Sequence, residues 1–260
     1  MANREVKPGA LYLYGVSPSA RAKSGKAGAG KTKSRKVSSP GIDGVHAVEA
    51  LACRGFTCWV SAVDQAAFAR ALQNNMENLE WLALHGVRHQ QVVGEVAKRE
   101  TVIPARFGTL FSSREALLKN VEGRKAALQK VVSRIADADE WGVKVFAEQQ
   151  PAPEAASRAR SGREYLQQKA SRLKKRPERD DSELDGLFTA LKKVSADSAP
   201  TGKVSGAQPD LLWQATFLVR RSRRRQWEKA LAEFVERWSG VRRIEVNGPW
   251  PPYSFVSDAD

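Results

Sequence analysis

Cysteine is scarce in this chain, which has Cys53 and Cys58 and no others among 260 residues. Two thiols are too few for the disulfide framework of a small secreted domain, and no second pair of cysteines or histidines completes a zinc-ligand pattern. The sequence therefore predicts a protein of a reducing, cytoplasmic compartment that holds no metal ion.

Long apolar runs are missing as well. No stretch reaches the roughly 18 consecutive apolar residues that a membrane-spanning helix needs, and the polar segment from Met1 to Pro8 lacks the apolar core of a secretion signal. We therefore expect no membrane partner. Hydrophobic residues still make up 42% of the chain and seven tryptophans are present, so the composition excludes a wholly disordered protein.

Acidic residues are absent from residues 19–39, where seven basic residues lie: Arg21, Lys23, Lys26, Lys31, Lys33, Arg35 and Lys36. These seven charges are half of the formal net charge of +14. Because segment 17–40 is rich in Gly, Ala, Ser and Lys, we expect it to be a disordered basic insertion. Its charge leaves open a nucleic-acid-binding function, which rests on charge alone and is disfavoured.

A phosphate-loop pattern lies inside this basic segment. Residues Gly25 to Thr32 match G-x-x-x-x-G-K-[ST] at every position. Such a loop needs a buried strand directly before it and a core helix directly after it. Here the preceding strand pattern ends at Val16, and residues 33–40 have no apolar helix face and end in proline. A solvated loop is the favoured interpretation, and an NTPase remains the alternative, which unchanged function in a Lys31→Ala variant would remove.

Strand and helix patterns alternate through the first half of the chain. Segments rich in aromatic and β-branched residues predict strands, and apolar residues at helical spacing predict helices. We expect strands at 10–16, 45–49, 56–62 and 141–145, and an extended segment at 102–111. A first helix should run from Asp64 to about Leu72, and a second should have on its inner stripe Leu79, Leu82, Gly86, His89, Val93 and Val96. A long helix capped by Ser112 or Ser113 should follow, with inner residues Leu117, Val121, Leu128, Val131 and Ile135.

The second half has a similar alternation. We expect a helical hairpin from an exposed helix within 154–176 and an amphipathic helix around 184–191, then a flexible linker at 195–209. A strand at 211–219, a helix with Trp227, Ala230, Leu231, Phe234, Val235 and Trp238 on one face, and a strand at 242–246 follow. The whole pattern predicts an α+β fold of two ferredoxin-like sandwiches, divided into domains 1–138 and 139–260.

Residues that could carry chemistry do not form a convincing site. His85 and His89 share a helix face, but the Glu of an H-E-x-x-H zinc motif is missing, and His89 lies on the apolar stripe. No G-x-S-x-G nucleophile elbow exists. We therefore predict no catalytic residue, no cofactor and no metal.

An arginine run, residues 220–225, joins a predicted strand to a predicted helix. Cations at a helix N-terminus oppose its dipole, which costs stability. That cost favours a binding role for Arg220, Arg221, Arg223 and Arg224, while exposed and tolerated arginines are the alternative.

Three sets of residues carry a resemblance to a known family. The first is LYLYGV at 11–16 with FTCWVSAV at 56–63. The second is HQQVV at 89–93, TVIPARFGTLF at 101–111 and EWGVKV at 140–145. The third is GPWPPYSFV at 248–256. In this order they resemble the gas vesicle protein F/L family (GvpF/GvpL), and they extend over most of the chain. They do not separate an F-like from an L-like protein.

This resemblance implies a fold and a function. The fold would be a modified ferredoxin-like N-terminal domain and a C-terminal α+β domain with prominent helices. The function would be that of a non-enzymatic accessory component of gas vesicle assembly, in the cytoplasm or at the vesicle. Its partners would be the small hydrophobic shell protein, whose aggregation it would prevent, and other vesicle accessory proteins. The basic insertion at 17–40 is longer than the family pattern leads one to expect.

Two motifs of the resemblance suggest partner contacts. Arg106 and Phe107 pair a guanidinium with an apolar ring, types that are enriched in binding hot spots. Trp250 and Tyr253 flank two prolines in a stiff segment that loses little entropy on packing. The alternatives are that Arg106 and Phe107 fix the turn into the long helix, and that the Trp250–Tyr253 segment packs across its own domain.

Overall fold

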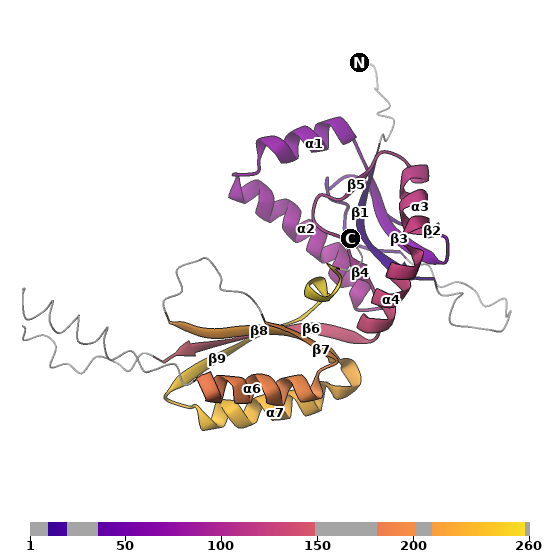
Figure 1. Ribbon diagram of the computed structural model, residues 1–260. Coiled ribbons are helices and arrows are strands. Elements are labelled where there is room, and N and C mark those ends of the chain that lie inside the picture. Colours follow the sequence, from indigo (N-terminus) through magenta and orange to yellow (C-terminus); the bar gives the residue numbers. More distant parts are fainter. Residues whose placement is uncertain (1–9, 20–35, 149–180, 201–209, 258–260) are drawn as a thin grey trace, which may run out of the picture. The chain divides into compact units, whose positions relative to one another are not determined.

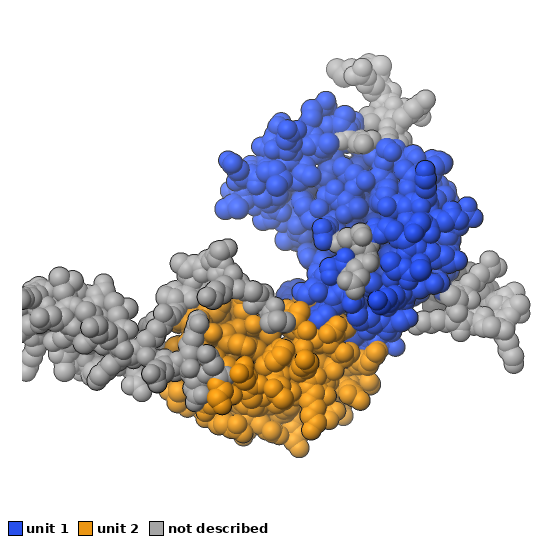
Figure 2. Space-filling model, viewed as in Figure 1, with its two compact units in different colours: residues 1–139, 249–260 blue, residues 140–248 orange. Residues whose placement is uncertain are grey.

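The computed structural model describes residues 10–19, 36–148, 181–200 and 210–257 (Figure 1). The chain divides into two compact units (Figure 2). The first unit is Met1–Asp139 with Pro249–Asp260, and the second is Glu140–Gly248. The expectation that all of 139–260 belongs to the second domain is therefore wrong for the last segment. Phe255 is buried, and Arg134 Nη2 of the first unit donates a hydrogen bond to its carbonyl oxygen over 2.6 Å.

The first unit is built on an antiparallel sheet with the order β2-β3-β1-β4, and β5 also pairs with β1. The first strand thus lies between the third and the fourth, and the second is at the edge, as in ferredoxin-like folds. The strands are β1 (Ala10–Pro18), β2 (Val48–Cys53), β3 (Phe56–Val63), β4 (Ile103–Pro104) and β5 (Leu110–Phe111).

Four helices of the described residues complete this unit: α1 (Gln65–Asn74), α2 (Leu79–Ala97), α3 (Arg114–Gly123) and α4 (Lys125–Ile135). Asp64 and Ser113 cap α1 and α3, as predicted. The expected long helix is wrong, because it is divided at Arg124, whose φ of −107° and ψ of 11° are not helical. Gly123 is a weak helix former at this break, and the break lets both pieces bury their apolar faces.

The sheet of the first unit has helices on both faces, α1 and α2 on one and α3 and α4 on the other (Figure 1). The core under α2 contains Tyr12, Tyr14, Trp59 and Val63 from the strands, with Val92, Val93 and Val96 from the helix. Successive residues of a strand point to opposite faces, so β1 contributes side chains to the packing on each face of this sheet.

The second unit repeats the same strand order. Its sheet runs β7-β8-β6-β9, and both described helices cover one face (Figure 1). Strand, helix, two strands, helix and strand follow one another along the chain, which is the ferredoxin-like sequence of elements. Its elements are β6 (Ala138–Ala147), α6 (Asp181–Val194), β7 (Asp197–Pro200), β8 (Leu211–Arg220), α7 (Arg224–Arg237) and β9 (Arg242–Trp250). The mixed α+β fold with two sheets is thereby confirmed.

Two expected flexible segments are partly regular. Within the predicted linker 195–209, β7 pairs antiparallel with β8, from Asp197 opposite Leu218 to Pro200 opposite Ala215. In the predicted insertion 17–40, β1 continues to Pro18, and the backbone N–H groups of Ser38 and Ser39 donate to the Glu95 carboxylate. The phosphate-loop pattern at 25–32 and the helix expected within 154–176 lie outside the described residues.

Candidate partner-binding surfaces

A tight turn, residues 106–109, interrupts the edge of the first sheet between β4 and β5. The N–H of Thr109 donates to the carbonyl of Arg106 over 3.2 Å, and Gly108 takes a φ of +82°, which favours glycine. On the β1 side, the N–H of Leu13 donates to the carbonyl of Thr109 and that of Ala105 to the carbonyl of Tyr14. The 106–109 turn is therefore fastened to β1 at both of its ends.

Two buried side chains also hold the 106–109 turn. The Tyr12 hydroxyl lies 2.9 Å from His89 Nδ1 and accepts a bond from the Gly108 N–H, while His89 Nε2 lies 3.2 Å from the carbonyl oxygen of Ala105. A carbonyl oxygen only accepts, so Nε2 carries the proton, Nδ1 accepts, and Tyr12 donates to it.

Burial controls the charge state of this pair. It lowers the pKa of His89 to about 4, although the bond to the Ala105 carbonyl acts in the opposite direction. It also raises the pKa of Tyr12 well above its ordinary value. Both side chains are neutral at physiological pH, as the hydrogen-bond pattern requires.

The turn presents the two residues that the sequence singled out. Arg106 is exposed, and Phe107 is 36% exposed with its ring edge-to-face to His89, the centroids 6.0 Å apart. The Tyr253 ring also lies near His89, at 6.5 Å, and packs against the first core. Trp250 is exposed. The structure thus brings Phe107 and Tyr253 close to the same histidine. It also assigns residues 249–260 to the first unit, whereas one interpretation of the sequence was that this segment packs across its own, second domain.

The arginine run begins at the end of β8 and continues through a short 3-10 helix, Arg221–Arg223, into α7. Arg224 is held in place, with Nε 2.7 Å from Glu228 Oε1 and the guanidinium 5.0 Å from the Trp141 ring centroid. Arg221 and Arg223 are exposed, and no side chain caps the N-terminus of α7.

One surface was missed by the sequence analysis: the side of α2 that faces away from the sheet. Leu79, Leu84 and Val87 are 79%, 50% and 54% exposed, and Ala83 is exposed as well. At 100° per residue these four side chains lie opposite the buried His89, Val92 and Val96. We call them the outer α2 face. The assignment of Leu79 to the inner stripe was wrong, because the first half of α2 also has large apolar residues on its outer side, around the exposed Glu80.

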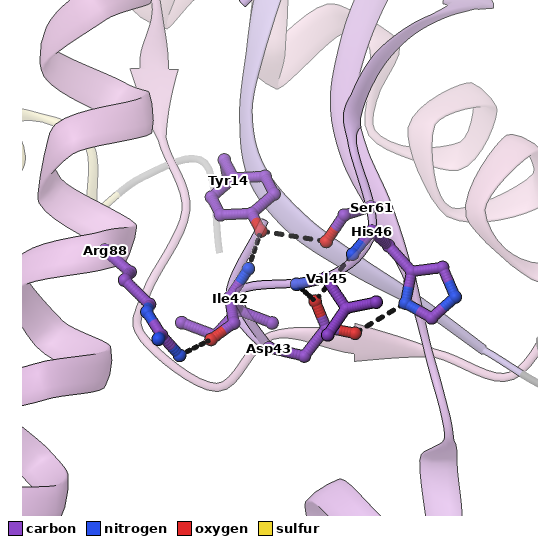
Figure 3. Close-up of polar contacts among 7 residues, drawn as sticks. All are labelled: Tyr14, Ile42, Asp43, Val45, His46, Ser61 and Arg88. Atoms are coloured by element: carbon purple, nitrogen blue, oxygen red, sulfur yellow. Dashed lines mark hydrogen bonds and ion pairs between the residues drawn. The ribbon is translucent and has the colours of Figure 1, made fainter. Parts of the chain in front are cut away.

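A second turn, residues 41–46, lies against the same helix (Figure 3). The Ile42 N–H donates to the Tyr14 hydroxyl over 2.6 Å, and Arg88 Nη1 of α2 donates to the Ile42 carbonyl over 3.2 Å. The Tyr14 hydroxyl in turn contacts Ser61 Oγ at 2.8 Å, and burial raises the pKa of Tyr14 to about 12. The 41–46 turn is thus tied to β1, β3 and α2.

Asp43 fixes the conformation of the 41–46 turn from within. Its carboxylate accepts from the N–H groups of Val45 and His46 and from His46 Nδ1 (Figure 3). Burial pushes the pKa of Asp43 up, but these bonds outweigh it and hold the pKa below its ordinary value. Val45 is 83% exposed at the tip of the turn, next to Gly44, which lies against the Arg88 guanidinium.

The histidine pair does not form a shared ligand site. His89 uses both ring nitrogens within the protein, and His85 Nδ1 lies 2.8 Å from the carbonyl oxygen of Trp81, whose ring it stacks on. Across the described ranges, no three His, Cys, Asp or Glu side chains gather as a metal would require. In the same ranges, no helix combines the length and apolar character needed to cross a bilayer.

Comparison with known proteins gives consistent results. The family model described as gas vesicle synthesis protein GvpL/GvpF matches residues 10–257. Gas vesicle protein L of Streptomyces sp. (strain CB03234) is 28% identical over 202 residues, which cover 73% of this chain and 75% of that protein. Gas vesicle protein F1 of Halobacterium salinarum is 28% identical over 171 residues, 65% of this chain and 67% of that protein.

Solved structures share the fold. The crystal structure of the gas vesicle protein GvpF from Anabaena sp. PCC7120 matches with a TM-score of 0.65 at 20% identity, over 95% of this chain and 96% of that chain. The GvpF structure from Microcystis aeruginosa matches with a TM-score of 0.60 at 17% identity, over 96% and 99% of the two chains. Both units of the present chain are therefore included in the likeness.

Proposed function

The chain belongs to the gas vesicle synthesis protein GvpL/GvpF family, and from this membership we propose that it is a non-enzymatic accessory protein that binds the hydrophobic shell protein during vesicle assembly. It acts in the cytoplasm or at the vesicle, covers apolar surface of shell subunits before they assemble, and so prevents their aggregation. Other vesicle accessory proteins are further partners. The role in vesicle assembly follows from the family, and the binding mode is argued from the surface.

One observation carries the binding mode: α2 carries large apolar side chains around the exposed Glu80, on the side that its own unit does not cover. The solvent side of a surface helix normally carries polar and charged residues. Leu79, Leu84 and Val87 are nevertheless at least half exposed, and Met76 just before the helix is 60% exposed. Exposed apolar side chains gathered on one helix are typical of partner-binding surfaces, whereas single ones need no explanation.

The 41–46 turn adds another exposed apolar residue beside the same helix. Val45 stands at its tip, and the turn is bonded to Arg88, which follows Leu84 by one helical turn. Arg88 also provides the arginine that binding hot spots often include beside apolar side chains. A shell subunit with an apolar helix or strand could cover Leu84, Val87 and Val45 together, which would remove all three from water.

The other candidate residues extend the proposal to a second partner type. Arg221 and Arg223 are exposed on the second unit, and Arg220 and Arg224 flank them. A group of arginines fits an acidic surface of another vesicle accessory protein. Phe107 and Trp250 are exposed aromatic residues that can contribute apolar contacts, whereas Tyr253 packs inward.

The test is co-expression of the full chain with the shell protein, followed by affinity capture. The double variant Leu84→Glu/Val87→Glu places two charges on the outer α2 face without touching either core. We expect it to lose the shell protein while its thermal unfolding stays close to that of the parent. Val235→Glu is the matched control, because Val235 is 47% exposed on α7 of the second unit.

The proposal for this surface is wrong if the double variant captures as much shell protein as Val235→Glu. Light scattering of the shell protein gives a second readout. The parent chain should delay its aggregation and the double variant should not.

A further inference from the structure

A small hollow of about 70 Å³ lies in the first unit, between β1, the 106–109 turn and the two helices α3 and α4. A water molecule needs about 10–15 Å³ by this measure, and an engineered apolar cavity of about 150 Å³ holds a benzene ring. The hollow therefore has room for the end of one branched aliphatic side chain. Its apolar lining includes Leu13, Val16, Ile103, Phe111, Val121 and Leu128.

Two guanidinium groups line the same hollow. Arg106 reaches it from the turn, and Arg124 from the junction of α3 and α4. The remaining polar side chains among the described lining residues are Thr109 and Asn120, and none of these described residues carries a carboxylate. A guanidinium such as that of Arg124, beside an apolar floor, favours a ligand that brings its own negative charge.

The position of Arg124 leaves its side chain available to a negatively charged ligand. It is the residue at which the predicted long helix breaks, so its side chain leaves the helix surface at the hollow and not along a continuous helix. Its Nη1 donates to Asn120 Oδ1 at 3.4 Å, which is at the long end for a hydrogen bond. A carboxylate could replace this weak contact with a charge-assisted pair of bonds in the fork geometry of arginine.

We propose that this hollow binds a partner-protein segment in which a branched aliphatic side chain is followed by Asp or Glu. The aliphatic end enters the apolar lining, and the carboxylate binds Arg124 at the rim. The site lies apart from the outer α2 face, on the other side of the sheet. It rests on the proposed function only in that the partner is a protein, and it adds the chemistry of a second contact.

Direct binding of blocked peptides to the full-length chain tests the site without any vesicle protein. The probe is acetyl-Ala-Leu-Glu-Ala-amide, with acetyl-Ala-Leu-Gln-Ala-amide as its uncharged counterpart and octanoate as a lipid-like anion. Binding is followed by the amide chemical shifts of Thr109, Val121 and Leu128 in NMR titrations. We expect saturable shifts at these residues with the Glu peptide, an affinity about tenfold weaker with the Gln peptide, and weaker binding of octanoate.

Variants of Arg124 and of its neighbour Lys125 test which positive charge binds the carboxylate. Arg124→Gln should weaken the Glu peptide about tenfold and leave the affinity of the Gln peptide unchanged. Lys125→Gln removes the same charge one residue away, outside the lining, and should change neither. Arg124→Lys keeps the charge without the forked guanidinium, and its affinity for the Glu peptide should lie between those of the parent and Arg124→Gln. This variant also tests the site if Arg124→Gln does not fold.

The proposal is overturned by equal affinity for the two peptides, by equal effects of the Arg124 and Lys125 variants, by tighter binding of octanoate, or by no saturable shift at the hollow. Because these peptides need no shell protein, the site can fail while capture through the outer α2 face succeeds, and the reverse is equally distinguishable.

Discussion

Tyr12 and His89 meet in the first core, hydroxyl to Nδ1 at 2.9 Å, across 77 residues of sequence. Together they bond the N–H of Gly108 and the carbonyl of Ala105. One pair of neutral side chains therefore fixes the turn that presents Arg106 and Phe107. The same pair links β1, α2 and the 106–109 turn, so the conformation of this surface is coupled to the stability of the whole unit.

His89 should make stability pH-dependent. The unfolded imidazole titrates near about 6.5, whereas the folded one remains neutral down to about pH 4. Between these values the unfolded chain binds more protons, so the free energy of unfolding rises with pH from about 4 to about 6.5 and is then level. Across this pH range the free energy of unfolding should rise by about 3 kcal/mol because of His89. Urea unfolding at a series of pH values measures it, and His89→Gln should flatten this part of the profile. An unchanged slope in that variant contradicts the prediction.

Tyr12→Phe should loosen one turn and spare the other. It leaves the Gly108 N–H and His89 Nδ1 without their partner, which costs about 1–3 kcal/mol. Hydrogen exchange at Gly108 should accelerate while that of Ile42 does not. Tyr14→Phe is the matched variant and should give the reverse, because the Tyr14 hydroxyl accepts from Ile42. Equal acceleration at both amides in either variant would refute separate anchoring of the two turns.

Gly15 and Gly86 should respond oppositely to alanine. A Cβ at Gly15 would lie 2.7 Å from the Ile103 carbonyl oxygen, so Gly15→Ala must push β4 away from β1 and lower the melting temperature. A Cβ at Gly86, inside α2, meets nothing within 4 Å. Gly86→Ala should therefore stabilise the helix by up to about 1 kcal/mol. Thermal unfolding of both variants measures the two changes. A lower melting temperature for Gly86→Ala would contradict the prediction that the added methyl group fits at that position.

Arg223 and Arg224 should differ although they are neighbours. Arg223→Glu replaces a cation at the N-terminus of α7 with an anion and should stabilise the second unit by about 0.3–1 kcal/mol, an effect that salt screens. Arg224→Ala should destabilise it, because Arg224 packs over Trp141 and pairs with Glu228. Denaturant midpoints measure both changes. If the run binds an acidic partner, Arg223→Glu should also weaken that binding despite its higher stability, and unchanged affinity would remove Arg223 from the binding surface.

Local patterns in the sequence determined much of this protein. The aromatic and β-branched segments at β1, β3 and β8, the apolar alternation at β6 and the caps Asp64 and Ser113 all depend on near neighbours in the chain, and the structure confirms them. The apolar face of α7 with Trp227 is confirmed as well, except at Val235, which is exposed. The motif set that resembles the GvpF/GvpL family likewise reads directly from residues, and it led to the correct family.

Tertiary structure alone decided which apolar surfaces are covered. A periodic pattern marks a side of a helix as apolar, but whether another segment covers that side depends on contacts between residues far apart in sequence. Hence Leu79 was expected inside and lies outside, the segment at Phe255 packs on the first unit, and Arg124 interrupts a helix to open a hollow. The outer α2 face stays exposed because no other described segment of its unit covers it, and the hollow forms only because β1, the 106–109 turn, α3 and α4 pack together.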